Sequence, residues 1–176
     1  MKNQESGGKN ILAIGAHPDD LELCCAGTLA KYRRNGYNVY MACVTDGRYG
    51  RTCPPDEMMK IRHAEAEKAA AVIGADLVWM GHSDLGIEDN LTLRNEIVEL
   101  IREIKPEVIF THDQGAFNPD HKAVCKTVCD SLIPCVTQTI NSKYSACKTM
   151  PVVYFMTTVC GTNFCPEEYV DISDTL

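Results

Sequence analysis

Short apolar runs alternate with helical segments along most of this chain, and this alternation restricts the possible fold more than any other feature. The predicted strands are residues 11–15, 39–45, 77–80, 108–111 and 152–157. The predicted helices are residues 19–34, 57–73, 91–105 and 119–132. Strands that alternate with helices require crossover connections, so they form a parallel sheet with helices packed on both faces. We therefore expect an α/β fold with a doubly wound, mostly parallel sheet.

Length and composition indicate one globular domain. The 176 residues are 45% hydrophobic, which is enough for one core. Residues 1–10 are polar and are predicted to be a disordered tail, and residues 11–176 are predicted to form a single, Rossmann-like domain. No apolar stretch approaches the roughly 20 residues that a membrane helix needs, and the N-terminus lacks the apolar core of a signal peptide. The sequence therefore predicts a cytoplasmic protein with no membrane span.

The chain also contains 10 cysteines. In a short secreted chain they would suggest a disulfide scaffold, but many of them lie within the apolar segments of a chain without an export signal. No Cys-x-x-Cys pair occurs, so we do not expect a cysteine metal site. The cysteines are predicted to be reduced and mostly buried.

Charge narrows the choice of partner. The formal net charge is −7 and the isoelectric point is near 5.2. Such a surface does not attract nucleic acid or an anionic membrane. A small molecule is therefore the expected ligand.

Two polar clusters follow two of the predicted strands. Residues 16–20, Ala-His-Pro-Asp-Asp, come directly after the first strand, and residues 111–121 follow the fourth. Ligands of doubly wound sheets bind beyond the carboxyl ends of the strands, where the strand order reverses. If the order is 3-2-1-4-5, the first and fourth strands are neighbours at that point. His17, Asp20 and His121 could then complete one metal site.

These motifs resemble the zinc-dependent deacetylases typified by N-acetylglucosaminyl-phosphatidylinositol de-N-acetylase (PIG-L) and the bacterial LmbE-like proteins. Ala-His-Pro-Asp-Asp is the signature of that family. The resemblance continues through Thr45-Asp46-Gly47, Arg62-His63-Ala64-Glu65, Ser83-Asp84, Pro119-Asp120-His121 and Tyr169-Val170-Asp171-Ile172-Ser173-Asp174. In the family a helical segment follows the last of these motifs, so the resemblance implies a domain truncated at its C-terminus.

The resemblance implies an N-deacetylase that removes an acetyl group from an N-acetylated sugar of the N-acetylglucosamine type, or from a conjugate of such a sugar. His17, Asp20 and His121 would bind Zn²⁺, and Asp19 would be the base that activates a water molecule. Three protein ligands leave a fourth position open, as a catalytic zinc requires. Two histidines and one carboxylate also suit iron, so Fe²⁺ is an alternative metal. A homo-oligomer is a further implication of the resemblance.

Four more residues belong to the predicted site. By resemblance, Asn118, Arg62 and Asp84 would contact the substrate or the oxyanion. Many relatives have a histidine at the position of Asn118, and asparagine can donate a hydrogen bond but cannot supply a proton. The proton for the leaving amine would then come from Asp19, once protonated, or from His112. The residues leave this choice open, and we favour Asp19.

Simpler interpretations exist for the same residues. Asp19 and Asp20 are favoured by the dipole at a helix N-terminus, and Arg62 and Glu65 are spaced for an ion pair along one helix. The alternative function is a non-catalytic α/β module that binds a sugar, a nucleotide or a metal ion. The chain has neither a Gly-x-Gly-x-x-Gly nor a Walker motif, which disfavours the nucleotide. A metal-binding fragment without activity is the third possibility.

Overall fold

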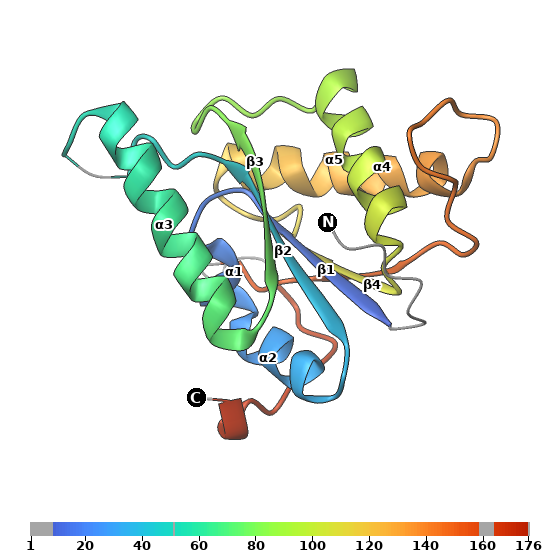
Figure 1. Cartoon of the computed structure of the whole chain (residues 1–176), viewed down its shortest axis with the longest axis horizontal. Coiled ribbons are helices and arrows are strands. Elements are labelled where there is room, and N and C mark those ends of the chain that lie inside the picture. The colour runs from blue at the N-terminus through green and yellow to red at the C-terminus, as the bar shows by residue number, and fades with distance from the viewer. Residues whose placement is uncertain (1–8, 51, 159–163, 176) are drawn as a thin grey trace.

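The structure is a computed structural model that describes residues 9–50, 52–158 and 164–175. At its centre is a five-stranded sheet in the order β3-β2-β1-β4-β5, in which every neighbouring pair is parallel (Figure 1). The strands are β1 (Asn10–Gly15), β2 (Asn38–Thr45), β3 (Asp76–His82), β4 (Val108–Thr111) and β5 (Val152–Phe155). The predicted parallel sheet and the assumed strand order are both confirmed.

Helices cover both faces of the sheet. They are α1 (Asp20–Cys24), α2 (Ala26–Arg34), α3 (Pro55–Ile73), α4 (Leu91–Ile104) and α5 (Pro119–Val136), and a short 3-10 helix, η1 (Ser173–Thr175), follows near the end of the chain. Side chains alternate along β1, so Leu12 and Ile14 pack in one core with α4 and α5. Ile11 and Ala13 pack in a second core with α1, α2 and α3. The sheet is therefore doubly wound, as predicted.

The segment predicted as one helix, residues 19–34, forms two helices. Cys25, at φ −148° and ψ 4°, leaves helical geometry and separates α1 from α2. Neither glycine nor proline marks this break, so the apolar pattern runs across it without a signal. Smaller differences occur elsewhere: α5 continues through Pro134 to Val136, and β5 ends at Phe155, two residues before the predicted end.

The N-terminal boundary of the sheet lies at Asn10. Residues 1–8 of the predicted tail lie outside the described residues, whereas Asn10 is the first residue of β1. Its side-chain amide donates to the Ile104 carbonyl at 2.5 Å, and Asn38 donates to its side-chain oxygen at 2.9 Å. Within the described ranges, no helix is both long enough and apolar enough to cross a membrane.

Arg102 on α4 holds the connection between α5 and β5. It is only 1% exposed, and its guanidinium donates at 2.6–3.3 Å to the backbone carbonyls of Pro134, Thr137, Ile140 and Tyr144. The first two carbonyls lie at the C-terminal end of α5, where unpaired carbonyls and the helix dipole favour a cation. Arg102 therefore closes this helix and fixes the loop that leads to the edge strand.

Replacing Arg102 with methionine should lower the free energy of unfolding by about 3 kcal/mol, because four partly buried carbonyls lose a charged donor. Urea denaturation measures the change. Lys60→Met, which removes an exposed cation from α3, is the control and should change stability by less than about 0.5 kcal/mol. Equal stability of Arg102→Met and the unmodified chain would contradict the anchoring role.

Candidate metal centre

The two polar clusters meet at the carboxyl ends of β1 and β4. Ile14 of β1 pairs with Thr111 of β4, and the Thr111 hydroxyl donates to the Ile14 carbonyl at 3.1 Å. The loops that follow these strands therefore emerge next to each other, at the point where the strand order reverses. A cavity of about 390 Å³ lies there, within the size range of small-molecule sites.

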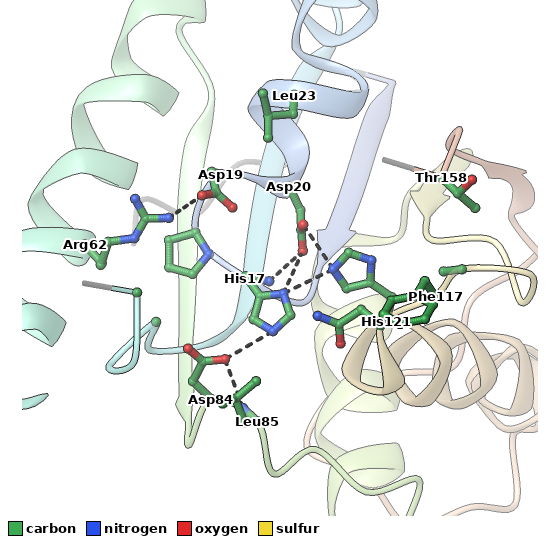
Figure 2. Close-up of a pocket in the computed structure, with 15 residues that line it drawn as sticks. His17, Asp19, Asp20, Leu23, Arg62, Asp84, Leu85, Phe117, His121 and Thr158 are labelled. Atoms are coloured by element: carbon green, nitrogen blue, oxygen red, sulfur yellow. Dashed lines mark hydrogen bonds and ion pairs between the residues drawn. The ribbon is translucent and has the colours of Figure 1, made fainter. Parts of the chain in front are cut away.

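Three side chains bring potential metal ligands together in this cavity (Figure 2). His17 Nδ1 lies 3.1 Å from His121 Nε2 and 3.4 Å from Asp20 Oδ2. His121 Nε2 lies 3.1 Å from Asp20 Oδ1. These are the three residues predicted as ligands, and the fold unites them although His17 and His121 are 104 positions apart.

We call His17, Asp20 and His121 the ligand triangle, and its separations suit a tetrahedral zinc ion. Zinc bonds to nitrogen and oxygen are about 2.0–2.2 Å long, so neighbouring ligand atoms in a tetrahedron lie about 3.3 Å apart. The two imidazole nitrogens are 3.1 Å apart, and they approach different oxygens of Asp20 at 3.4 Å and 3.1 Å, so each pair of residues has about that spacing. Imidazole and carboxylate suit Zn²⁺ and also Fe²⁺. The residues present therefore fit the implied metal.

Two buried carboxylates hold the other side of the His17 ring. His17 Nε2 lies 3.1 Å from Asp84 Oδ1 and 3.1 Å from Asp120 Oδ2. A carboxylate at this position fixes the orientation of a metal-binding imidazole and makes it a better ligand. His17, Asp84 and Asp120 also lie close enough together to hold an ion themselves. A neutral imidazole offers only one lone pair, however, so the two groups cannot both use His17 at once.

Asp120 is the residue of this site whose role the sequence analysis missed. It is 2% exposed, and besides contacting His17 it accepts the backbone amides of Leu85 at 2.9 Å and Ile87 at 3.3 Å. Asp120 thus joins the first turn of α5 to the loop after β3. The motif that contains it was visible, but an aspartate in the first turn of a helix has an ordinary explanation in the helix dipole.

The charged groups of the cluster stabilise one another. Burial disfavours the charged ring of His17, but hydrogen bonds to Asp20 and Asp120 and the charges nearby outweigh it and raise the His17 pKa to about 9. Burial would raise the pKa of the Asp20 carboxyl, but the three imidazoles around it hold that pKa well below its usual range. A metal ion that binds here therefore competes with a proton on His17.

Asp19 lies beside the ligands and is held by α3. Asp19 Oδ2 accepts a hydrogen bond from Arg62 Nη2 at 2.6 Å, and Arg62 Nη1 donates to Glu65 Oε2 at 3.0 Å. Figure 2 shows the Asp19 carboxylate directed toward Arg62. The φ of Asp19 is +133°, a backbone conformation that residues with a side chain rarely adopt. Burial raises the pKa of its carboxyl, although Arg62 opposes the rise.

Close packing around Pro18 fixes this turn from the side of β2. Gly47 has φ +63°, and a Cβ on it would lie 2.9 Å from Pro18 Cγ. Only glycine fits both the conformation and the space. The neighbouring amide of Thr45 donates to the Ala16 carbonyl at 2.8 Å. The loop after β2 therefore supports the loop that carries His17.

Asn118, the predicted contact of the oxyanion, and His112, one of the two candidates for the general acid, occupy different positions. Asn118 lines the cavity, and its Oδ1 accepts the Asp120 amide at 2.8 Å, which leaves its amide nitrogen to donate to a ligand. His112 is 3% exposed, and its Nε2 accepts the Ala16 amide at 2.9 Å. Its ring stacks on that of His121 with centroids 3.8 Å apart, and burial lowers its pKa. His112 therefore packs against His121 and is not among the described residues that line the cavity. Arg62 and Asp84, the other two predicted contacts of the substrate, do line it.

Comparison with known proteins identifies related sequences. The family model for GlcNAc-PI de-N-acetylases (PIG-L) matches residues 12–132. A probable N-acetyl-alpha-D-glucosaminyl L-malate deacetylase 2 of Bacillus anthracis is 32% identical over 142 residues, or 75% of this chain and 61% of that protein. A mycothiol S-conjugate amidase of Streptomyces coelicolor is 29% identical over 138 residues, or 63% of this chain and 47% of that protein. The chain thus spans about half to three fifths of the length of these relatives.

Solved structures share the fold. The N,N'-diacetylchitobiose deacetylase of Pyrococcus horikoshii superposes with a TM-score of 0.84 at 24% identity, over 96% of this chain and 66% of that chain. GalB, the 4-carboxy-2-hydroxymuconate hydratase of Pseudomonas putida, superposes with a TM-score of 0.85 at 19% identity, over 94% of this chain and 73% of that chain. At these identities the likeness establishes the fold alone, and the two names describe different reactions.

Replacing Asp120 with asparagine should weaken Zn²⁺ binding about 10- to 100-fold, because an amide cannot hold the His17 ring as a carboxylate does. Competition against a chromophoric chelator measures the affinity. Asp130→Asn, an exposed position on the same helix, is the matched control and should bind Zn²⁺ as the unmodified chain does. If Asp120→Asn binds equally well, Asp120 does not support the metal site.

Proposed function

The chain belongs to the PIG-L family of GlcNAc-PI de-N-acetylases, and from this premise we propose that it is a zinc-dependent N-deacetylase. Its substrate would be an N-acetylated sugar of the N-acetylglucosamine type or a conjugate of one. One observation carries the proposal: His17, Asp20 and His121 form a triangle of metal-binding size, and Asp19 lines the same cavity. The names of the Bacillus and Streptomyces relatives, a deacetylase and an amidase, support the same type of reaction.

His17, Asp20 and His121 would hold the metal. When bound, Zn²⁺ supplies a Lewis acid that polarises the acetyl carbonyl and lowers the pKa of water. Fe²⁺ can supply similar chemistry and suits the same ligands, so the choice of Zn²⁺ rests on the family and not on the geometry of the site. Asp84 and Asp120 keep the His17 ring oriented toward the other two ligands.

The remaining chemistry falls on side chains along the cavity wall. Asp19 takes a proton from the attacking water as the water oxygen bonds to the acetyl carbon. The Asn118 amide donates to the carbonyl oxygen as that oxygen gains negative charge. Asp19 then returns its proton to the nitrogen while the carbon–nitrogen bond breaks. The products are acetate and a free amine. The stacking of buried His112 behind His121 supports Asp19, rather than His112, as the proton donor.

The remaining expectations belong to the same proposal. The partner would be a small N-acetyl amino sugar or its conjugate and not nucleic acid, for which the net charge of −7 is the support. A cytoplasmic location and a homo-oligomer rest on the sequence pattern and the family resemblance. The alternative of a non-catalytic binding module predicts metal or sugar binding without release of acetate.

Replacing Asp19 with asparagine should lower kcat for acetate release about 10²- to 10⁴-fold, because the amide cannot accept a proton. Zinc content, measured by elemental analysis, should stay at the level of the unmodified chain because Asp19 is outside the ligand triangle. Glu22→Gln on α1 is the matched control and should retain activity. Two results would contradict the proposal. The first is an unmodified protein that contains no zinc. The second is a zinc-containing protein that releases no acetate from any N-acetyl sugar, and this result would favour the binding module.

The contact between Arg62 and Asp19 gives Arg62 a second interpretation besides substrate binding. If Arg62 holds Asp19 in place, Arg62→Gln should lower kcat about 10²-fold with little change in KM, and Arg62→Lys should restore part of the loss. Steady-state kinetics separate the two parameters. Lys68→Gln on the same helix is the control. A rise in KM at unchanged kcat would instead assign Arg62 to the substrate.

A further inference from the structure

Three large apolar side chains stand exposed around the mouth of the cavity. Leu23 is 71% exposed, Leu85 is 66% exposed and Phe117 is 85% exposed, and all three line the cavity. Figure 2 shows them on three sides of the cluster of histidines and aspartates, with Arg62 on the fourth. We call Leu23, Leu85 and Phe117 the apolar rim. Apolar side chains that line a cavity around a small number of polar groups are typical of a small-molecule site.

The backbone holds the apolar rim in place. Leu85 has φ +57°, which a leucine rarely adopts, and its amide donates to Asp84 Oδ1 and Asp120 Oδ2, both at 2.9 Å. The Leu23 amide donates to the Asp19 carbonyl at 2.9 Å, one turn along α1. Phe117 directly precedes Asn118, the N-cap of α5. Leu23 and Leu85 are therefore held by backbone hydrogen bonds to residues of the site, and Phe117 is next in sequence to one of them.

The described lining of the cavity offers no unpaired cation to an anionic aglycone. Among the described residues that line it, Arg62 is the one Lys or Arg, and it is paired with Asp19 and Glu65. Asp19, Asp20 and Asp84 also line the cavity. A carboxylate or phosphate on the aglycone would therefore find no unpaired Lys or Arg among the described lining residues to bind it. An uncharged aglycone needs no such partner.

We propose that the apolar rim binds an uncharged aryl or alkyl group carried by the sugar, so that the preferred substrates are N-acetylglucosaminides with an apolar aglycone. The inference rests on the proposed function, because the sugar must place its acetamido group beside Asp19. It deepens that function by naming the substrate class. Free sugars and conjugates with an acidic aglycone, such as a malate, are the poorer substrates.

The test compares three β-glycosides of N-acetylglucosamine that differ only in the aglycone: methyl, phenyl and malyl. The zinc-loaded protein should release acetate from the phenyl glycoside with a kcat/KM about tenfold or more above that of the methyl glycoside. The malyl glycoside should do no better than the methyl one. Equal kcat/KM for methyl and phenyl, or a preference for malyl, would overturn the inference.

Variants locate the effect on the apolar rim. Phe117→Ser, Leu23→Gln and Leu85→Asn should each lower the ratio of the phenyl to the methyl kcat/KM, and asparagine tolerates the positive φ at position 85. Val72→Ser on α3, at the same 85% exposure as Phe117 but outside the cavity, should keep the ratio. Equal losses on both substrates would mean that the rim contacts only the sugar ring, which contradicts the assignment to the aglycone.

Binding measurements separate this inference from the proposed function. If no glycoside releases acetate, the deacetylase proposal fails, but equilibrium dialysis of the phenyl and methyl glycosides still decides the role of the rim. Tighter binding of the phenyl glycoside that Phe117→Ser abolishes supports the rim. Sedimentation of the same variants covers a further outcome: if Phe117→Ser dissociates an oligomer without changing the ratio, the rim is a contact between copies of this chain and the inference is wrong.

Discussion

The parallel pairing of β1 with β4 is the constraint on which the rest of the site depends. Ile14 and Thr111 are aligned across this pair, and the residues that follow each strand meet directly: the Ala16 amide donates to His112 Nε2 at 2.9 Å. His17 and His121 are 104 positions apart in the sequence, and this alignment is what brings their side chains together. The cluster is thus a product of topology. Its two histidines come together because two strands that are distant in sequence are neighbours in space.

The sequence predicted the layers of this fold better than the contacts within its site. Apolar periodicity located every strand of the sheet, and the carboxyl-end rule predicted that His17, Asp20 and His121 lie close together, as the structure shows. The break at Cys25, the contact of Asp120 with His17 and the contact of Arg62 with Asp19 had no local signal. The two contacts depend on a partner from another helix or strand, and the break depends on a backbone angle that the residue type of Cys25 does not predict. Contacts between residues that are distant in sequence cannot be predicted from the local pattern of a single sequence.

The fold by itself does not select a reaction. A deacetylase and a hydratase superpose on this chain with nearly equal TM-scores. The content of the cavity is what bears on function: buried histidines and aspartates that compensate one another, and the apolar rim around them. Buried charges are tolerated when they are paired or bound to a metal ion, and the histidines and aspartates of this cluster are paired with one another. The site, rather than the sheet, therefore carries the functional argument.

Asp19 and Asp20 are consecutive, yet their carboxylates serve different neighbours. Asp20 begins α1 and contacts the histidines, while Asp19, with its positive φ, contacts Arg62. Pro18 packs closely against Gly47 in the loop after β2, and this packing fixes the turn that directs the two carboxylates to different neighbours. The two roles therefore depend on the length of this turn as well as on its residues, because one residue more or less would change which side chain follows the strained position at Asp19.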